Sequence, residues 1–373
     1  MFVDTTTFLL KNSFLSIHFF ISLQKFCVIL FYRILYSSIV FLALLLTPTS
    51  FVAAQDIVFN HLLSAPQYTN PAFVGTFGTY HASAAVRSQY TASTNIGKTI
   101  YADFDTYVSK WNSGLGAYIM NDRSSGGIFQ TTSFGAAYSY AFRLSENIEL
   151  RPALQAVFYL SQFNSHNFIF PDDLGTGGST LFPNEQSSKT QIDFSAGLLI
   201  QHPQFVIGGA IQHIGASNPD SLIFYGDRSL KITLHGQASI LLSGNPELLP
   251  LNEWSAFENL VIVPQAKFIH QSDFQYLVAG AAIRSGGLFA GLALKTPFQN
   301  QTFLGSLFLG LESTSLKVGY NFDFLTGGGN LRGWDSGSHE IFIHYSFGQS
   351  GENTSSRGRK FKSRIDPTCN CPY

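Results

Sequence analysis

The chain has 373 residues, a formal net charge of −1 and only 12% charged residues. It therefore lacks the basic surface that a nucleic-acid partner requires and the charge that a soluble domain of this size normally exposes. Aromatic residues reach 15%, which suits a wall that faces lipid. None of the three Cys lies between Cys27 and Cys369, which excludes a disulfide-stapled body.

Residues 1–54 have the features of a signal peptide. Lys25 and Arg33 form a positive flank, 34–46 are apolar, and the segment ends in Val52-Ala53-Ala54. This pattern predicts cleavage before Gln55. The alternative is a permanent transmembrane anchor, because the apolar run is long enough to span a bilayer. Residues 1–25 add a second apolar run, so we expect an overlong N-terminus from a translation start placed too far upstream.

After residue 54, apolar and polar side chains alternate with period two, most clearly in 230–240, 315–324 and 340–347. In 315–324 one face carries Leu316, Val318, Tyr320, Phe322 and Phe324, and the other carries Lys317, Asn321 and Asp323. Alternation of this kind places each set on one side of a sheet. Charges on one face only fit a wall between lipid and water.

The same reading predicts fourteen strands in chain order. They are expected near 79–92, 98–109, 113–121, 129–143, 147–160, 190–201, 204–214, 229–242, 258–270, 273–284, 286–295, 301–310, 314–324 and 338–347. The fold class is therefore all-β, a transmembrane antiparallel β-barrel of about 14 strands in the cell outer membrane, spanning residues 79–347. A soluble β-sandwich is the competing fold.

The connections between these strands set the orientation. Connections 144–147 and 201–203 are short, whereas 161–189, 215–228, 243–257 and 325–337 are long. Outer-membrane barrels place tight turns in the periplasm and long loops outside. With an even strand count, both ends of the barrel domain then point to the periplasm.

Two segments lie outside the predicted wall. Residues 55–78 are apolar but contain two prolines, and we expect them either to plug the lumen or to cross its periplasmic mouth. Residues 348–373 form a basic periplasmic tail whose cations are Arg357, Arg359, Lys360, Lys362 and Arg364. This tail is either simply solvated or a contact for an acidic partner.

The sequence offers no catalytic, cofactor or metal motif. It contains no GxxxxGK[ST], HExxH or GxSxG, so we expect a protein that is not an enzyme. Asp103 and Asp105 share a strand face, and we expect them to pair with Arg87 or Arg151 rather than to catalyse. His235 is expected to be a hydrogen-bonded lumen histidine. Two further features give no defined site: the loop acids Asp172 and Asp173, and the pair Cys369 and Cys371.

Several stretches, in order, resemble the PorP/SprF family of type IX secretion membrane proteins. They are Gln55-Asp56, then Asn70-Pro71-Ala72-Phe73-Val74-Gly75, Arg87-Ser88-Gln89-Tyr90, Gly114-Leu115-Gly116 with Met120-Asn121-Asp122-Arg123, Tyr320-Asn321-Phe322-Asp323, Ser336-Gly337-Ser338-His339-Glu340 and Cys371-Pro372-Tyr373. The chain departs from the family pattern at Val74, where Ala is common, and at Tyr90, where Trp is common.

This resemblance implies a non-enzymatic outer-membrane component of type IX secretion or gliding machinery that helps to export or anchor a surface protein or adhesin. Its expected partners are outer-membrane lipids, periplasmic core proteins of the machinery and a secreted adhesin or cargo protein. Asn70, Pro71, Phe73 and Gly75 form either a structural or a docking motif, and Asn121, Asp122 and Arg123 are expected in an external loop. The rival functions are a passive porin-like diffusion channel and a structural wall protein with a plugged lumen.

Overall fold

A computed structural model describes residues 56–347 of the chain, apart from residues 60, 63, 79, 90–96, 125–126, 165–185, 216–227, 244–259, 273, 298–302, 314 and 326–336. The predicted signal peptide and the basic tail lie outside the described residues. Among the residues that are described, no helix is long and apolar enough to cross a membrane.

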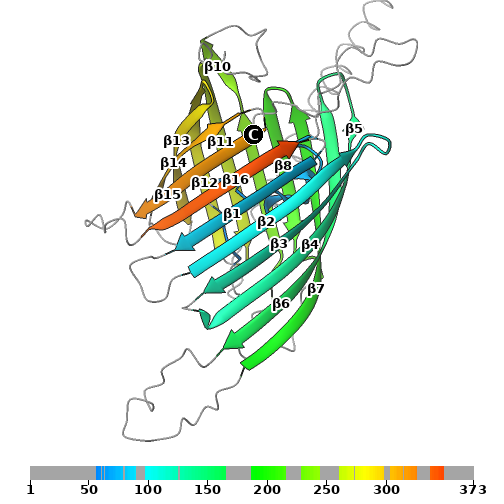
Figure 1. Ribbon diagram of the computed structural model, residues 1–373, viewed down its shortest axis with the longest axis vertical. Coiled ribbons are helices and arrows are strands. Elements are labelled where there is room, and N and C mark those ends of the chain that lie inside the picture. The colour runs from blue at the N-terminus through cyan, green and yellow to red at the C-terminus, as the bar shows by residue number, and fades with distance from the viewer. Residues whose placement is uncertain are drawn as a thin grey trace, which may run out of the picture. The chain divides into compact units, whose positions relative to one another are not determined.

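The described chain is nearly all strand (Figure 1). The strands are β1 (Tyr80–Gln89), β2 (Gly97–Val108), β3 (Ser113–Ser124), β4 (Phe129–Tyr140), β5 (Phe142–Arg143), β6 (Glu149–Asn164), β7 (Gln186–His202), β8 (Phe205–Gln212), β9 (Lys231–Ala238), β10 (Ile240–Ser243), β11 (Leu260–Gln271), β12 (Phe274–Ser285), β13 (Leu288–Pro297), β14 (Leu304–Glu312), β15 (Leu316–Leu325) and β16 (Ser338–Phe347).

These strands form a closed antiparallel barrel. Each pairs with its neighbours in chain order, and β16 pairs with β1 from Tyr80 opposite Phe347 to Gln89 opposite Ser338. Because β5 continues β4 and β10 continues β9, the wall has fourteen strands. The prediction of a fourteen-stranded transmembrane barrel is confirmed, and each predicted strand overlaps one strand of the wall.

Side chains alternate between the two faces of the wall as the sequence predicts. In β16, Ile341 is 57% exposed on the outside, whereas its neighbour Glu340 is fully buried inside. The inward face of β9 likewise carries Lys231 and His235, both buried, while Leu234 points outward. The charged residues in the middle of the wall strands therefore line the lumen, the apolar ones form the surface that faces lipid, and the exposed cations Lys98, Arg123 and Arg143 lie near strand ends.

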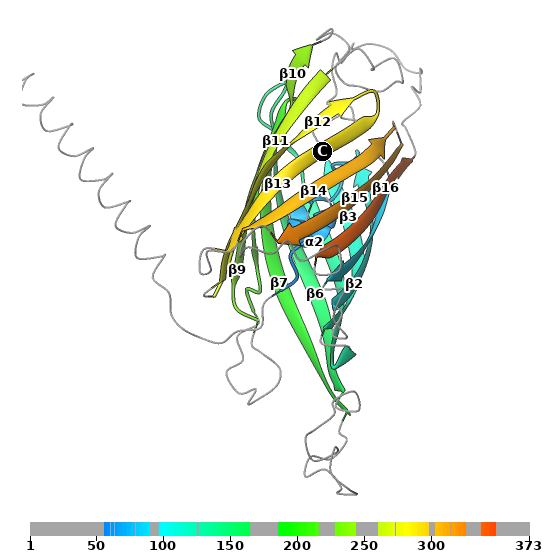
Figure 2. The same ribbon diagram turned by 90° about the vertical axis from the view of Figure 1, so that its left-hand side faces the viewer.

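The two ends of the barrel differ in their connections. At one end, here called the turn end, 109–112, 144–148, 203–204, 286–287 and 313–315 link the strands, with 244–259 as the long exception. At the other, here called the loop end, the links are 90–96, 125–128, 165–185, 213–230, 298–303 and 326–337, with 272–273 as the short exception. The longest strands, β6 and β7, extend past their neighbours at the loop end (Figures 1 and 2).

The described residues of 56–78, here called the plug, lie inside the barrel. They include the short helix α2 (Pro66–Thr69), seen between the walls in Figure 2, and a 3-10 turn, η1 (Pro71–Phe73). The two prolines occupy the first position of these two elements, where proline costs no hydrogen bond. The side chain of Asn70 caps the second element by accepting from the Ala72 amide at 2.9 Å.

Candidate functional site

Wall side chains bind the backbone of the plug along its length. The Lys267 ammonium donates to the Phe59 carbonyl at 2.8 Å, and the Gln212 amide donates to the Tyr68 carbonyl at 2.7 Å. In the same way Arg87 donates to Val58, Gln155 donates to Gln67, and Glu340 accepts from the His61 amide. Buried peptide groups that lack sheet partners need such contacts. The charged and amide side chains of the lumen therefore hold an irregular polypeptide in place.

Asn70 fixes the middle of the plug to three strands. Its Nδ2 donates to the carbonyls of Leu198 at 3.2 Å and Gly209 at 3.1 Å, which belong to β7 and β8. The same atom lies 3.0 Å from Nε2 of His235 on β9. The prediction that His235 is a hydrogen-bonded lumen histidine is confirmed, and its partner is the plug.

The last turn of the plug is held at the turn end of the barrel. The Gly75 amide donates to the Asp105 carboxylate at 2.8 Å, and the Val74 carbonyl accepts from Ser139 at 2.7 Å and from Arg151 at 3.2 Å. Gly75 has φ +76°, a left-handed conformation that disfavours residues with a side chain. This turn therefore requires glycine at position 75.

Glycines in the wall let the plug approach the sheet closely. A Cβ added to Gly114 would stand 2.3 Å from the Val74 carbonyl oxygen, and one added to Gly197 would stand 2.1 Å from Oδ1 of Asn70. Contacts this short are impossible, so only glycine allows the observed approach. The glycine positions of β3 and β7 and the motif at 70–75 thus fit together as one unit.

Charged and polar groups surround Asp56 at the loop end. Its carboxylate lies 2.6 Å from Nε2 of His213, 3.2 Å from Arg228 and 3.3 Å from the ammonium of Lys231. The other ring nitrogen of His213 contacts Asp193, and the backbone amide of Asp56 donates to Gln271 at 3.1 Å. The carboxylate of Asp56, with His213, Arg228, Lys231 and Asp193, is called the Asp56 cluster below.

The charges within the Asp56 cluster shift the pKa values of Asp56 and His213. Burial raises the pKa of the Asp56 carboxyl, but the charges of His213, Lys231 and Arg228 outweigh burial and hold this pKa well below 3.8. Burial lowers the pKa of His213, yet the carboxylates of Asp56 and Asp193 outweigh it, so this pKa lies above 6.5. Both shifts favour a charged pair.

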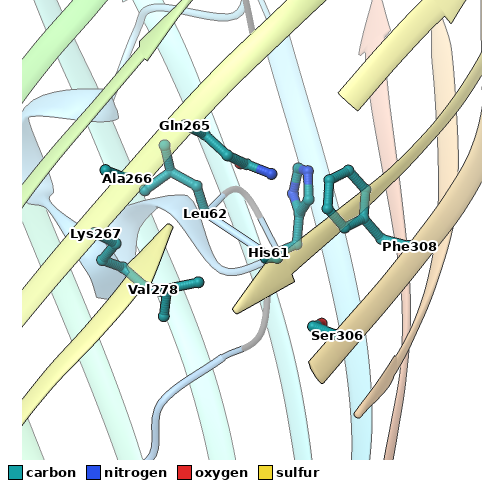
Figure 3. A pocket seen from close by; sticks show the side chains of 9 residues that line it. His61, Leu62, Gln265, Ala266, Lys267, Val278, Ser306 and Phe308 are labelled. Carbon is teal, nitrogen blue, oxygen red and sulfur yellow. The ribbon is translucent and has the colours of Figure 1, made fainter. Parts of the chain in front are cut away.

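Aromatic side chains fill the space beside the plug. The ring of His61 stacks on Phe342 at 5.1 Å and meets Phe308 edge-on at 5.4 Å. Next to it lies a cavity of about 10 Å³ lined by Gln265, Ser306 and others (Figure 3), which is at the lower limit for one water.

One three-residue group of the described chain has the composition of a metal site, namely His81, Asp103 and Asp105. These carboxylates already accept hydrogen bonds. Asp103 accepts from Tyr101 at 2.6 Å and from Ser83, and Asp105 accepts from Gly75 and lies 2.8 Å from Nδ1 of His81. Binding a cation would break these bonds, so the group is a hydrogen-bonded network of the wall and plug.

Two expectations from the sequence were wrong. Asp103 and Asp105 do not pair with Arg87 or Arg151, because Arg87 contacts Val58 and Glu340 and Arg151 pairs with Glu149.

Asn121, Asp122 and Arg123 do not form a loop, since β3 continues to Ser124. There Asn121 donates to Thr132 at 2.8 Å, and Asp122 accepts from Thr99 at 2.8 Å.

The predicted partner-binding residues fall into two groups. The structure brings Asn70, Pro71, Phe73 and Gly75 together inside the lumen, where Asn70, Pro71 and Phe73 are buried against the wall. The basic residues 357–364 lie outside the described residues. Sequence reasoning missed the Asp56 cluster, for which the signals were Asp56 in the family-like opening and the inward position of Asp193 and Lys231 in their strands.

Comparison with solved structures returns outer-membrane proteins at low similarity. Omp33 of Acinetobacter baumannii is 9% identical, with 73% of this chain and 100% of that chain covered and a TM-score of 0.40. A FadL homologue of Pseudomonas aeruginosa is 10% identical, with 75% and 93% covered and a TM-score of 0.38. These values carry no functional argument. No curated protein matches the chain.

Comparison with protein families gives a specific result. The family described as type IX secretion system membrane protein PorP/SprF matches residues 51–345, which include the plug and nearly the whole barrel. With the fourteen-stranded barrel this match places the protein in the outer membrane. The chain belongs to the PorP/SprF family of type IX secretion system membrane proteins.

Proposed function

We propose that this component of the type IX secretion outer membrane binds an exported surface protein or adhesin and helps to export or anchor it. In this role the protein acts through binding and carries out no reaction of its own. The family membership supports a place in the secretion machinery. The finer role, with its cargo and its periplasmic partners, is the part that we propose.

The observation that carries the proposal is the occupied lumen. Lumen-facing side chains such as Glu340, Lys295 and Asn321 are almost fully buried, and so are Phe59 and Phe73 of the plug. A diffusion channel needs water along its axis, whereas this interior is packed like a protein core. The passive channel is therefore the weaker alternative, and a role in binding is favoured.

The experiment compares the surface and secreted proteomes of cells with and without the gene, and of cells complemented with the wild-type chain. Loss of one large adhesin on deletion, restored by complementation, would identify a dedicated partner. Loss of many exported proteins would place the protein in the core machinery. Unchanged proteomes would refute the secretion role.

The basic tail is tested in the same cells. Replacing Arg357, Arg359, Lys360, Lys362 and Arg364 with Gln should lower export if the tail contacts an acidic periplasmic partner. The matched control replaces Lys110 and Arg143, exposed cations at the turn end, and should export normally. Equal export by both variants would show that the tail is only solvated.

A further inference from the structure

The plug runs through the lumen from one end of the barrel to the other. At its N-terminal end, Asp56 contacts residues of the loop end. His213 directly follows β8, Arg228 and Lys231 lie at the start of β9, and Gln271 is the last residue of β11. Asp56 itself therefore lies toward the loop end.

At its C-terminal end, the plug contacts residues of the turn end. Gly75 bonds to Asp105, near the last residue of β2, and Val74 bonds to Ser139 and Arg151, near the end of β4 and the start of β6. Tyr68 still contacts the loop-end residue Gln212, and the chain approaches the turn end from Asn70 onward, where it contacts Leu198 of β7. The plug then enters β1 from the turn end.

The turn end is the periplasmic end of an outer-membrane barrel, because such barrels place tight turns inside and long loops outside. β16 ends at Phe347 on the turn end, opposite Tyr80. We propose that the N-terminal end of the plug, at Asp56, faces the cell surface, on the opposite side of the outer membrane from Phe347 at the end of β16.

The Asp56 cluster is the contact that holds this end of the plug inside the lumen, toward the loop end. Arg228 also stacks on Tyr159 with 3.8 Å between its guanidinium carbon and the ring centre, and the Lys231 ammonium lies 4.5 Å from the ring centre of Tyr68. Wall and plug side chains thus fix both cations that face the carboxylate. The cluster is built into the wall and is not a chance surface contact.

If the proposed function holds, an exported protein at the cell surface meets the external end of the plug. The topology itself does not rest on that function.

The test is cysteine labelling of intact cells with a membrane-impermeant maleimide. A Gln55→Cys variant in a Cys369→Ser, Cys371→Ser background reports the N-terminus, and the wild-type chain with its own Cys369 and Cys371 is the matched control for the periplasmic side. We expect Cys at position 55 to react equally on intact and permeabilised cells. Cys369 and Cys371 should react only after permeabilisation.

Labelling of position 55 only after permeabilisation, or only after denaturation, would overturn the proposal. A second reporter guards against a cysteine that disturbs the plug. An epitope tag inserted after Gln55 should bind antibody on intact cells, whereas the same tag after Tyr373 should bind only after permeabilisation. The reverse pattern would contradict the topology whether or not the proteome experiment supports a secretion role.

Discussion

Val74 and Gly114 approach each other so closely that a Cβ on Gly114 would stand 2.3 Å from the Val74 carbonyl oxygen. The plug and β3 are therefore packed without space for a side chain between them. The same carbonyl accepts hydrogen bonds from Ser139 and Arg151, so it has little freedom to move. This contact links a family-like motif in the plug to a glycine position in the wall.

Gly114→Ala should destabilise the folded barrel, because the added methyl group forces the plug or the strand to shift. Overpacking of this kind costs about 1–3 kcal/mol. Thermal unfolding in detergent, followed by loss of β-sheet circular dichroism, measures the effect. Gly236→Ala on β9 is the control, since its Cβ would meet its nearest atom at 3.6 Å. Equal unfolding of the two variants would contradict tight plug packing.

Asn70→Asp should loosen the middle of the plug. The substitution keeps the shape of the side chain but removes the donor to the Leu198 and Gly209 carbonyls. Loss of this buried donor costs about 1–3 kcal/mol, and the new carboxyl oxygen would face the two carbonyl oxygens. The expected result is lower thermal stability and faster protease cleavage within residues 56–78. Asn112→Asp, at an exposed turn, should behave as wild type, and a stable Asn70→Asp protein would contradict the anchoring role.

The contacts of the Asp56 cluster should weaken both at low pH and at high pH. The pKa of Asp56 is lowered below 3.8, so its contribution is present above that value and is lost as pH falls through the lowered pKa. The pKa of His213 is raised above 6.5, so its contribution is present below 6.5 and is lost as pH rises through the raised pKa. Docking of the plug end should therefore be firmest between these limits.

Maleimide labelling of the Gln55→Cys variant in detergent measures this dependence. The labelling rate should increase as pH rises past the raised pKa of His213. The measured rates are first corrected for the pH dependence of maleimide reaction with the same thiol in a free peptide. Because Arg228 and Lys231 still face the carboxylate, the increase should be partial. An Asp56→Asn variant should label quickly at every pH, and a wild-type cluster with no pH response would contradict the assignment.

Leu292→Arg should test which surface faces lipid. Leu292 is 61% exposed in the middle of β13, and a cation at mid-membrane costs about 2–4 kcal/mol in a barrel of this kind. Leu288→Arg, at the start of the same strand, should cost about 0–1 kcal/mol, as expected near an interface. Unfolding in lipid vesicles compares the two. Equal costs would mean that β13 does not cross the bilayer as described.

The sequence predicted the strands of the barrel wall better than the contacts inside the lumen. Alternation in β9, β15 and β16 was readable because each strand has one face in lipid and one face in the lumen. The ends of strands are harder to predict where the last residues are polar. The sequence predicts a loop at Asn121, but β3 continues through the polar residues 121–124 beyond its apolar part. Period-two alternation identifies a face but not where a strand stops.

The partners inside the lumen could not be predicted in the same way. His81, Asp105 and Gly75 meet because β1, β2 and the plug converge, and no local pattern encodes that meeting. The Asp56 carboxylate contacts residues 157 to 175 positions further along the chain, so the members of the cluster look like isolated polar residues in the sequence. Only the register of the closed barrel brings them together.

Conductance in planar lipid bilayers tests most directly whether the lumen is occupied by the plug. We expect the wild-type protein to show no steady ion conductance, and a variant lacking residues 56–64 to conduct, because removal of that segment takes the buried side chains of Phe59, His61 and Leu62 out of the lumen. A steady porin-like conductance of the wild-type chain, unchanged by the deletion, would contradict the plugged lumen and restore the diffusion channel as the function.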